Sequence, residues 1–127
     1  MYTISTNAAP EAIGPYSQAQ MALGFIFCSG QIPINPKTGT VDTATIIEQT
    51  RQACENVKAI LEAAGSDMSK VVKTTCYLAD MDDFNSFNAI YAEYFISKPA
   101  RSCVAVKSLP KGVLCEIEVI AEKNKNG

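Results

Sequence analysis

The chain has 127 residues, of which 47% are hydrophobic and 19% are charged, and this length and composition suit one packed domain and exclude a disordered or fibrous chain. The formal net charge of -2 provides no positive field to attract a nucleic-acid backbone. We therefore predict a single domain over residues 1–127 and disfavour nucleic acid as its main partner.

The first third of the sequence predicts a β-hairpin followed by a loop. Two short apolar runs flank Gly24 within residues 18–29, and the second run is rich in aromatic and branched side chains, as strands are. Two prolines and a glycine in residues 32–39 prevent regular strand pairing and indicate an ordered connection rich in turns.

A long amphipathic helix is predicted over residues 45–64 and is marked at both ends. Thr45 and Glu48 match a capping box, in which the hydroxyl and the carboxylate bond free backbone amides, and Gly65 suits the left-handed residue beyond a helix end. The buried face of this helix is expected to carry Ile46, Ile47, Ala53, Cys54, Val57, Ile60, Leu61 and Ala64.

A half-buried strand is predicted over residues 71–78, where alternation places Val72 on the face of Cys76 and Val71 on the opposite face. Acidic residues then precede a second helix, at the end where the helix dipole favours negative charge, and Pro99 is expected to end that helix. The core side of this second helix is expected to carry Phe84, Phe87, Tyr91 and Tyr94.

Residues 101–106 and 114–121 are predicted to form a C-terminal antiparallel hairpin. The order of the elements then fits an α+β fold in which two helices cover one face of a single sheet. The other face of the sheet has no helix to cover it, and we expect it to carry Cys115, Ile117 and Val119. A closed homo-oligomer would bury such a face.

Histidine is absent and cysteine occurs five times. Without an imidazole, Ser-His and Cys-His nucleophilic systems are excluded, and the usual metal sites have few candidate ligands, so no metal is expected. The odd number of cysteines favours reduced thiols. Because no basic region precedes an apolar stretch at the N-terminus and no apolar run approaches the length of a membrane span, we expect a cytoplasmic protein.

Arg101 is a candidate for binding a ligand. Alternation along its strand places Arg101 and Cys103 on one side, and a guanidinium matches a carboxylate with two parallel hydrogen bonds. From spacing alone, such an arginine is more often an ordinary surface ion pair, and Cys103 is more often a packing residue than a nucleophile. Glu116 and Glu118 share a face of the last strand, where a partly buried carboxylate could hold water or transfer a proton.

Three further positions give weaker signals. Tyr16 follows a restricted Gly-Pro turn, and Gly30 stands beside Ser29 at a strand end, where a ligand could approach the backbone closely. Asn88 lies within the second helix. Taken singly, each of these residues is more often structural or simply exposed.

Four ordered segments of the sequence together closely resemble the RidA (YjgF) family of reactive-intermediate deaminases. These segments are AIGPYSQA at 12–19, SGQIP at 29–33, NVKAIL at 56–61 and PARSC at 99–103. The resemblance spans nearly the whole chain. On this basis we expect Arg101 to bind a ligand rather than to form an ordinary surface ion pair. It implies a chorismate-mutase-like, ferredoxin-like α+β subunit with a single mixed sheet, assembled as a homotrimer around a central barrel, with active sites in the clefts between subunits.

The resemblance also implies an activity and a set of roles. The protein would be a 2-iminobutanoate/2-iminopropanoate deaminase, which hydrolyses 2-aminoacrylate and 2-aminocrotonate released by pyridoxal-phosphate enzymes to 2-keto acids and ammonia, with no cofactor of its own. Arg101 would hold the substrate carboxylate and Glu116 would position the water. The pocket would be lined by Ser29, Gly30, Asn88 and Cys103 and closed by Tyr16. The connection at 96–98 is shorter than the family's usual one, which puts the substrate range in question.

Two other functions stay open at this point. Ribonuclease activity or inhibition of translation, historically attached to the family, would need phosphate contacts from a basic surface, and the acidic balance of the chain disfavours this. A non-enzymatic role, either as a thiol-rich chaperone or as a regulator that binds keto acids, could use the same motifs.

Overall fold

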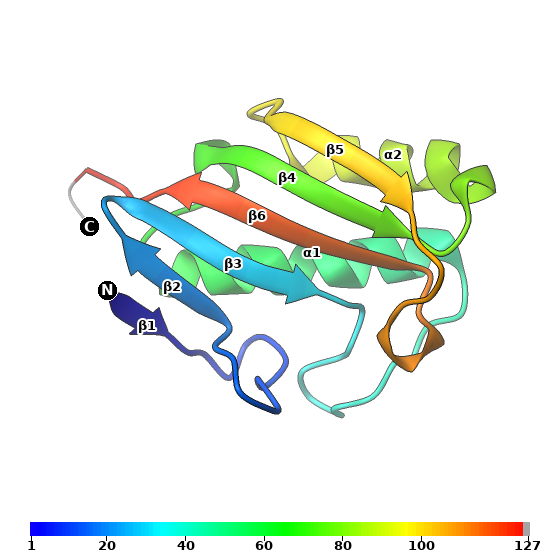
Figure 1. Ribbon diagram of the computed structural model, residues 1–127, viewed down its shortest axis with the longest axis horizontal. Helices are drawn as coiled ribbons and strands as arrows, with labels where there is room; N and C mark the ends of the chain where they lie inside the picture. The colour runs from blue at the N-terminus through cyan, green and yellow to red at the C-terminus, as the bar shows by residue number, and fades with distance from the viewer. Residues whose placement is uncertain (126–127) are drawn as a thin grey trace.

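The computed structural model describes residues 1–125, so the last two residues of the predicted domain lie outside the described part. One mixed sheet of six strands forms one layer, and both helices, α1 (Ile46–Ala63) and α2 (Phe84–Tyr94), pack behind it (Figure 1). The strands are β1 (Tyr2–Ile4), β2 (Ala19–Ala22), β3 (Phe25–Gln31), β4 (Val71–Leu78), β5 (Ala100–Ala105) and β6 (Cys115–Glu122). The predicted α+β architecture is confirmed, and β1 is an additional strand that the sequence did not indicate.

The strand order β1-β2-β3-β6-β4-β5 places the last strand in the middle of the sheet. The predicted hairpin of residues 101–106 with 114–121 is therefore wrong, because β4 lies between these two strands. The helix α2 provides the crossover that lets β5 pair with β4 in parallel. The connection from 106 to 114 passes the end of β4, where the N–H of Ala79 donates to the carbonyl of Leu114 over 3.0 Å.

The predicted hairpin around Gly24 is present, with β2 and β3 antiparallel and Leu23 and Gly24 both at positive φ. Two such residues in a tight turn match the right-handed twist of the flanking strands. The helix α1 begins after Thr45, whose hydroxyl accepts from the N–H of Glu48 over 3.2 Å. The Glu48 carboxylate accepts from that same hydroxyl over 2.9 Å rather than from a backbone amide, so only half of the predicted capping box forms.

The C-terminal end of α1 matches the prediction. Gly65 has φ 78°, and the N–H of Ser66 donates to the carbonyl of Leu61 over 2.9 Å. These are marks of a Schellman motif, in which a left-handed residue returns the chain and satisfies the last carbonyls. The helix α2 ends at Tyr94, before Pro99, because the chain turns away from helical geometry at Phe95.

Two predicted faces differ from the structure in detail. A register shift between Val71 and Lys73 interrupts the alternation of β4, so Val71 is buried and Val72 is exposed. Ile47 is 48% exposed, whereas the other predicted residues of its stripe are buried or packed against the core. A helix presents only part of its circumference to the sheet, and Ile47 lies in the first turn, outside that part.

The alternation of the central strand β6 shows which residues lie on each face of the sheet. Cys115, Ile117 and Val119 point toward the helices and are at most 2% exposed. The expectation that these three residues lie on the uncovered face is therefore wrong. The uncovered face, toward the viewer in Figure 1, carries Glu116 and Glu118 together with a group of apolar and aromatic side chains on β3, β4, β5 and β6. That group comprises Phe25, Phe27, Tyr77, Val104 and Ile120.

Within residues 1–125, no helix is long and apolar enough to cross a membrane.

The difference between Ile117 and Ile47 gives a test of this core. Truncating Ile117 to alanine removes a fully buried side chain between the sheet and α1, and the free energy of unfolding should fall by about 2–5 kcal/mol. Ile47→Ala is the matched control and should change it by no more than about 0.5 kcal/mol. Chemical denaturation of both variants measures this difference, and equal losses would contradict the assignment of faces.

Candidate active site

Arg101 lies on the edge strand β5, on the side of the sheet that the helices cover. Its Nη1 donates to Oδ1 of Asn88 over 2.6 Å, and its guanidinium carbon lies 4.7 Å from the ring centre of Tyr91 and 5.5 Å from that of Phe84. Aromatic faces attract a guanidinium, so α2 holds the cation from two directions. The bond to Asn88 occupies only one of its five N–H donors, so a carboxylate could still be bound through two others.

The platform under Arg101 is itself fixed. The Tyr91 hydroxyl is 2.7 Å from the hydroxyl of Thr74 on β4, and its ring stacks on Phe95 at a centroid distance of 4.3 Å. The arginine opens into a cleft of about 680 Å³ between α2 and β5, which we call the arginine cleft. It is lined by Asn88, Tyr91, Ala92, Phe95, Ile96, Lys98, Pro99 and Arg101.

Cys103 shares the face of Arg101, as alternation predicts, but it has a different role. It pairs with Cys76 across β4 and β5 and packs against the core. Burial raises the pKa of the Cys103 thiol, and the positive charge of Arg101 offsets this only in part. A thiol with a raised pKa is largely protonated at neutral pH and is a poor nucleophile. The geometry therefore favours packing over covalent chemistry for Cys103.

A second cleft, which we call the glutamate cleft, contains the other predicted residues. Its volume is about 470 Å³, and it lies between the end of β3, the uncovered side of β6 and the segment that precedes β2. It is lined by Pro10, Glu11, Tyr16, Gln18, Ser29, Gly30, Gln31, Ile32, Ile34, Pro110, Glu116 and Glu118.

Gly30 lets the Glu116 side chain approach the backbone closely in the glutamate cleft. A Cβ atom at Gly30 would lie 2.8 Å from Cδ and 3.1 Å from Cγ of Glu116, so the Glu116 side chain would have to shift. Burial and the neighbouring charge of Glu118, in that order, raise the pKa of the Glu116 carboxyl. Glu118 accepts from the Tyr77 hydroxyl over 2.7 Å. The raised pKa makes the Glu116 carboxyl a stronger base than an ordinary carboxylate and suits it to accept a proton.

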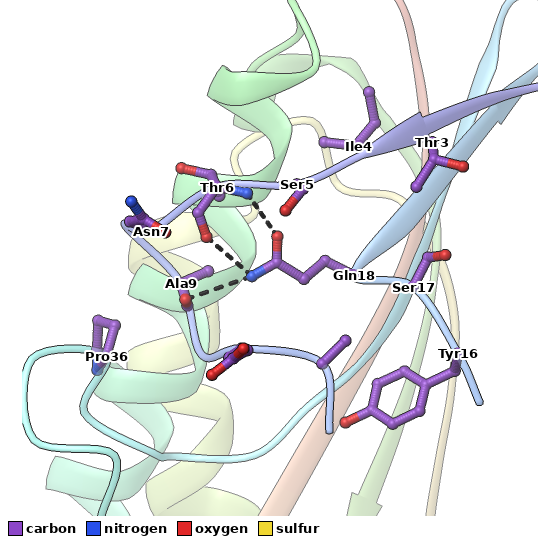
Figure 2. Close-up of a pocket in the computed structure, with 12 residues that line it drawn as sticks. Thr3, Ile4, Ser5, Thr6, Asn7, Ala9, Tyr16, Ser17, Gln18 and Pro36 are labelled. Carbon is purple, nitrogen blue, oxygen red and sulfur yellow. Dashed lines mark hydrogen bonds between the residues drawn. The ribbon is translucent and has the colours of Figure 1, made fainter. Parts of the chain in front are cut away.

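Gln18 fixes the segment that carries Tyr16, and sequence reasoning assigned it no role. Its Oε1 accepts from the N–H of Thr6 over 2.7 Å, and its Nε2 donates to the carbonyls of Thr6 and Ala9 (Figure 2). Ser29 completes the connection, since its hydroxyl donates to the carbonyl of Ser17 over 2.6 Å. The Tyr16 ring is 55% exposed and extends from this anchored segment. The available signal in the sequence was a long polar side chain placed between a Gly-Pro turn and an apolar strand.

Asn56 supports the opposite wall and was also missed. From α1 its Nδ2 donates to the carbonyls of Ile32 and Ile34, over 3.1 and 2.9 Å, and it is 1% exposed. Buried amides of this kind are costly to leave unpaired, so this contact fixes the loop that lines the glutamate cleft. The polar residue within the apolar stripe of α1 was the available signal.

The two clefts lie on opposite faces of the sheet. Arg101 pairs with Thr74, whose side chain points to the helices, whereas Glu116 pairs with Tyr77 on the uncovered face. The structure therefore brings Arg101 together with Asn88, and Glu116 together with Tyr16, Ser29 and Gly30, but keeps these groups apart. Within one chain, no small ligand can contact Arg101 and Glu116 together.

The fold and the two clefts define a ferredoxin-like α+β protein with a fixed arginine suited to carboxylate binding. Comparison with known proteins identifies the family. The family described as Endoribonuclease L-PSP matches residues 6–123. The chain therefore belongs to this family, which is the RidA (YjgF) family that the motifs resemble.

Individual relatives are similar to this chain over nearly its whole length. A RutC family protein of Pyrococcus horikoshii is 59% identical over 121 residues, covering 94% of this chain and 96% of the relative. The 2-iminobutanoate/2-iminopropanoate deaminase of Escherichia coli K12 is 51% identical over 123 residues, covering 94% and 95%. The crystal structure of E. coli TdcF with bound serine has a TM-score of 0.93 at 42% identity, covering 98% and 100%.

The contact of Gly30 with Glu116 can be tested by a double-mutant cycle. Gly30→Ala should lower the free energy of unfolding by about 1–3 kcal/mol, because the new methyl group forces the Glu116 side chain to move. In a Glu116→Ala background the same substitution should cost much less, giving a coupling above about 0.5 kcal/mol. Thermal or urea unfolding of the four proteins measures it, and additive effects would exclude the close approach.

Proposed function

We propose that the protein is a 2-iminobutanoate/2-iminopropanoate deaminase. The observation that carries this proposal is the Arg101 guanidinium, which is held by Asn88 and two aromatic rings at a cleft that is otherwise largely apolar. Such a site suits a small molecule with one carboxylate and a short side chain. The E. coli relative named as a deaminase and the serine bound to E. coli TdcF support the same ligand chemistry.

The proposed reaction is hydrolysis without redox change. The oxygen of a water molecule adds to the imine carbon next to the carboxylate, the carbon–nitrogen bond breaks, and nitrogen leaves as ammonia while a keto group forms. Glu116, with its raised pKa, accepts one proton of the water as the oxygen adds and passes it to the nitrogen. It then moves the proton of the new hydroxyl group to the same nitrogen, which leaves as ammonia. An imine is already electrophilic, so orientation by Arg101 and a placed water suffice without a covalent nucleophile.

We further propose that the active site forms between subunits of a homotrimer. Arg101 and Glu116 lie on opposite faces of one sheet, so a substrate that contacts both needs one residue from each of two chains. The uncovered face also carries large exposed side chains, including Phe27 at 46% and Val104 at 47% exposure. Exposed apolar side chains of this kind favour association, and three such sheets would enclose a central barrel.

Ribonuclease activity is the second candidate, because the matching family is named for it. The charges of the glutamate cleft disfavour it. Glu11, Glu116 and Glu118 line the glutamate cleft, and carboxylates repel a phosphodiester backbone.

We also propose a cytoplasmic location for the protein. All five cysteines are free thiols, which agrees with a reducing compartment.

The deaminase proposal predicts different outcomes for two arginines. When a serine or threonine dehydratase supplies the imine, the parent protein should accelerate keto acid release, and Arg101→Ala should lower kcat/KM by about 10²-fold or more. Arg51→Ala is the matched control: this exposed arginine bonds Glu93 on the helix surface, and its loss should change the rate by less than about twofold. No acceleration by the parent protein would contradict the proposal.

A substitution at Cys103 distinguishes the non-covalent mechanism from a covalent one. Cys103→Ser preserves the size of the side chain and should keep kcat/KM within about threefold of the parent, because a packing thiol is replaceable. The same coupled assay measures this. A loss as large as that of Arg101→Ala would show that the thiol takes part in the chemistry.

A further inference from the structure

The arginine cleft contains a second cation that the proposed reaction does not use. Lys98 lines the same cleft as Arg101, and none of the described residues that line it is acidic. The substrates proposed above have one carboxylate, which Arg101 is sufficient to bind. Lys98 is exposed at the edge of this cleft and therefore provides a positive charge with no assigned partner beside a site for small anions.

The position of Lys98 is fixed by the short connection between α2 and β5, the yellow turn in Figure 1. Phe95 is 3% exposed and anchors its start, and the Lys98 N–H donates to the Phe95 carbonyl over 3.2 Å. The Ser97 hydroxyl donates to the carbonyl of Val71 over 2.7 Å. Lys98 itself has φ 51°, and Pro99 follows it. These contacts hold the backbone of Lys98 at the wall of the cleft.

The surroundings leave the Lys98 charge without compensation. The nearest acidic residue in sequence is Glu93 on α2, but its carboxylate bonds Arg51 of α1 at 3.2 Å and does not line the cleft. The helix residues that face the cleft, Asn88, Tyr91 and Ala92, are all uncharged. Within this chain's part of the proposed site, the two cations have no carboxylate beside them, which favours a ligand with two negative charges.

We propose that Lys98 gives this protein a preference for 2-imino dicarboxylates, the imines formed from acidic amino acids, over imines with an apolar side chain. The inference rests on the proposed function and names its substrate class. Arg101 binds the carboxylate next to the imine, for which a planar fork is suited, and Lys98 binds the distal carboxylate as a compact, mobile charge. Ile96 and Pro99 contact the methylene groups between them. The distal carboxylate is unchanged by hydrolysis.

Binding of two stable keto acids tests this without requiring turnover. The probes are 2-oxoglutarate and 2-oxopentanoate, which have equal chain length and differ only in the distal carboxylate. Calorimetry at low ionic strength should show about a three- to tenfold preference of the parent protein for 2-oxoglutarate, weakened by added salt. Lys98→Met should remove the preference, because it weakens 2-oxoglutarate binding several-fold more than 2-oxopentanoate binding, and Lys98→Glu should reverse it.

Lys58→Met is the control, because it removes the same charge from an exposed position on α1 outside the arginine cleft. This variant should retain the preference. Equal binding of the two keto acids by the parent, or a preference that survives Lys98→Met, would overturn the inference while leaving deamination of the smaller imines in place. Failure of the parent to bind either acid or to accelerate imine hydrolysis would overturn the proposed function as well.

Discussion

The alternation of β6 at the centre of the sheet determines how the rest of the molecule is arranged. Every second residue of this strand, from Cys115 to Ala121, is buried under the helices, and every residue between them points to the uncovered face. A one-residue slip would exchange the two sets, so the hydrophobic core fixes the register strongly. The same constraint places Glu116 on the uncovered face and against Gly30. The alternation that packs the core therefore also determines the position of the Glu116 carboxyl.

The opposite faces of the sheet give the two clefts different electrostatic characters. The glutamate cleft contains carboxyls in a partly buried setting, which raises the pKa of Glu116 and suits proton exchange. The arginine cleft contains cations beside aromatic and aliphatic side chains, which suits the binding of anions. Neither cleft is complete for imine hydrolysis. Their separation within a chain makes association of subunits a requirement of the proposed chemistry.

Local patterns in the sequence predicted the elements more reliably than their pairing. Both helices, the turn at Gly24 and the Schellman motif at Gly65 depend on residues close in sequence. The predicted hairpin of the last two strands failed because strand pairing is non-local, and β5 finds its partner across α2. Alternation separated Glu116 from Ile117 but could not show which of them faces the helices, because the sequence does not say which face is covered.

Candidate residues could be named from motifs, but their grouping could not. Arg101 and Asn88 are brought together by the crossover, and Gly30 and Glu116 by the pairing of β3 with β6. Gln18 and Asn56 support the site through buried amides whose partners are backbone carbonyls distant in sequence. A backbone carbonyl is the same in every residue, so no residue type marked these partners in the sequence.

Subunit mixing is the most direct test of the claim that Arg101 and Glu116 act together from different chains. Arg101→Ala and Glu116→Ala, each with a different affinity tag, should be inactive alone. After both are unfolded and refolded together, trimers that carry both tags should regain about a third of the parent activity, because one of the three shared sites in each mixed trimer has both residues intact. Doubly tagged oligomers without imine hydrolysis, or a protein that stays monomeric, would contradict the account.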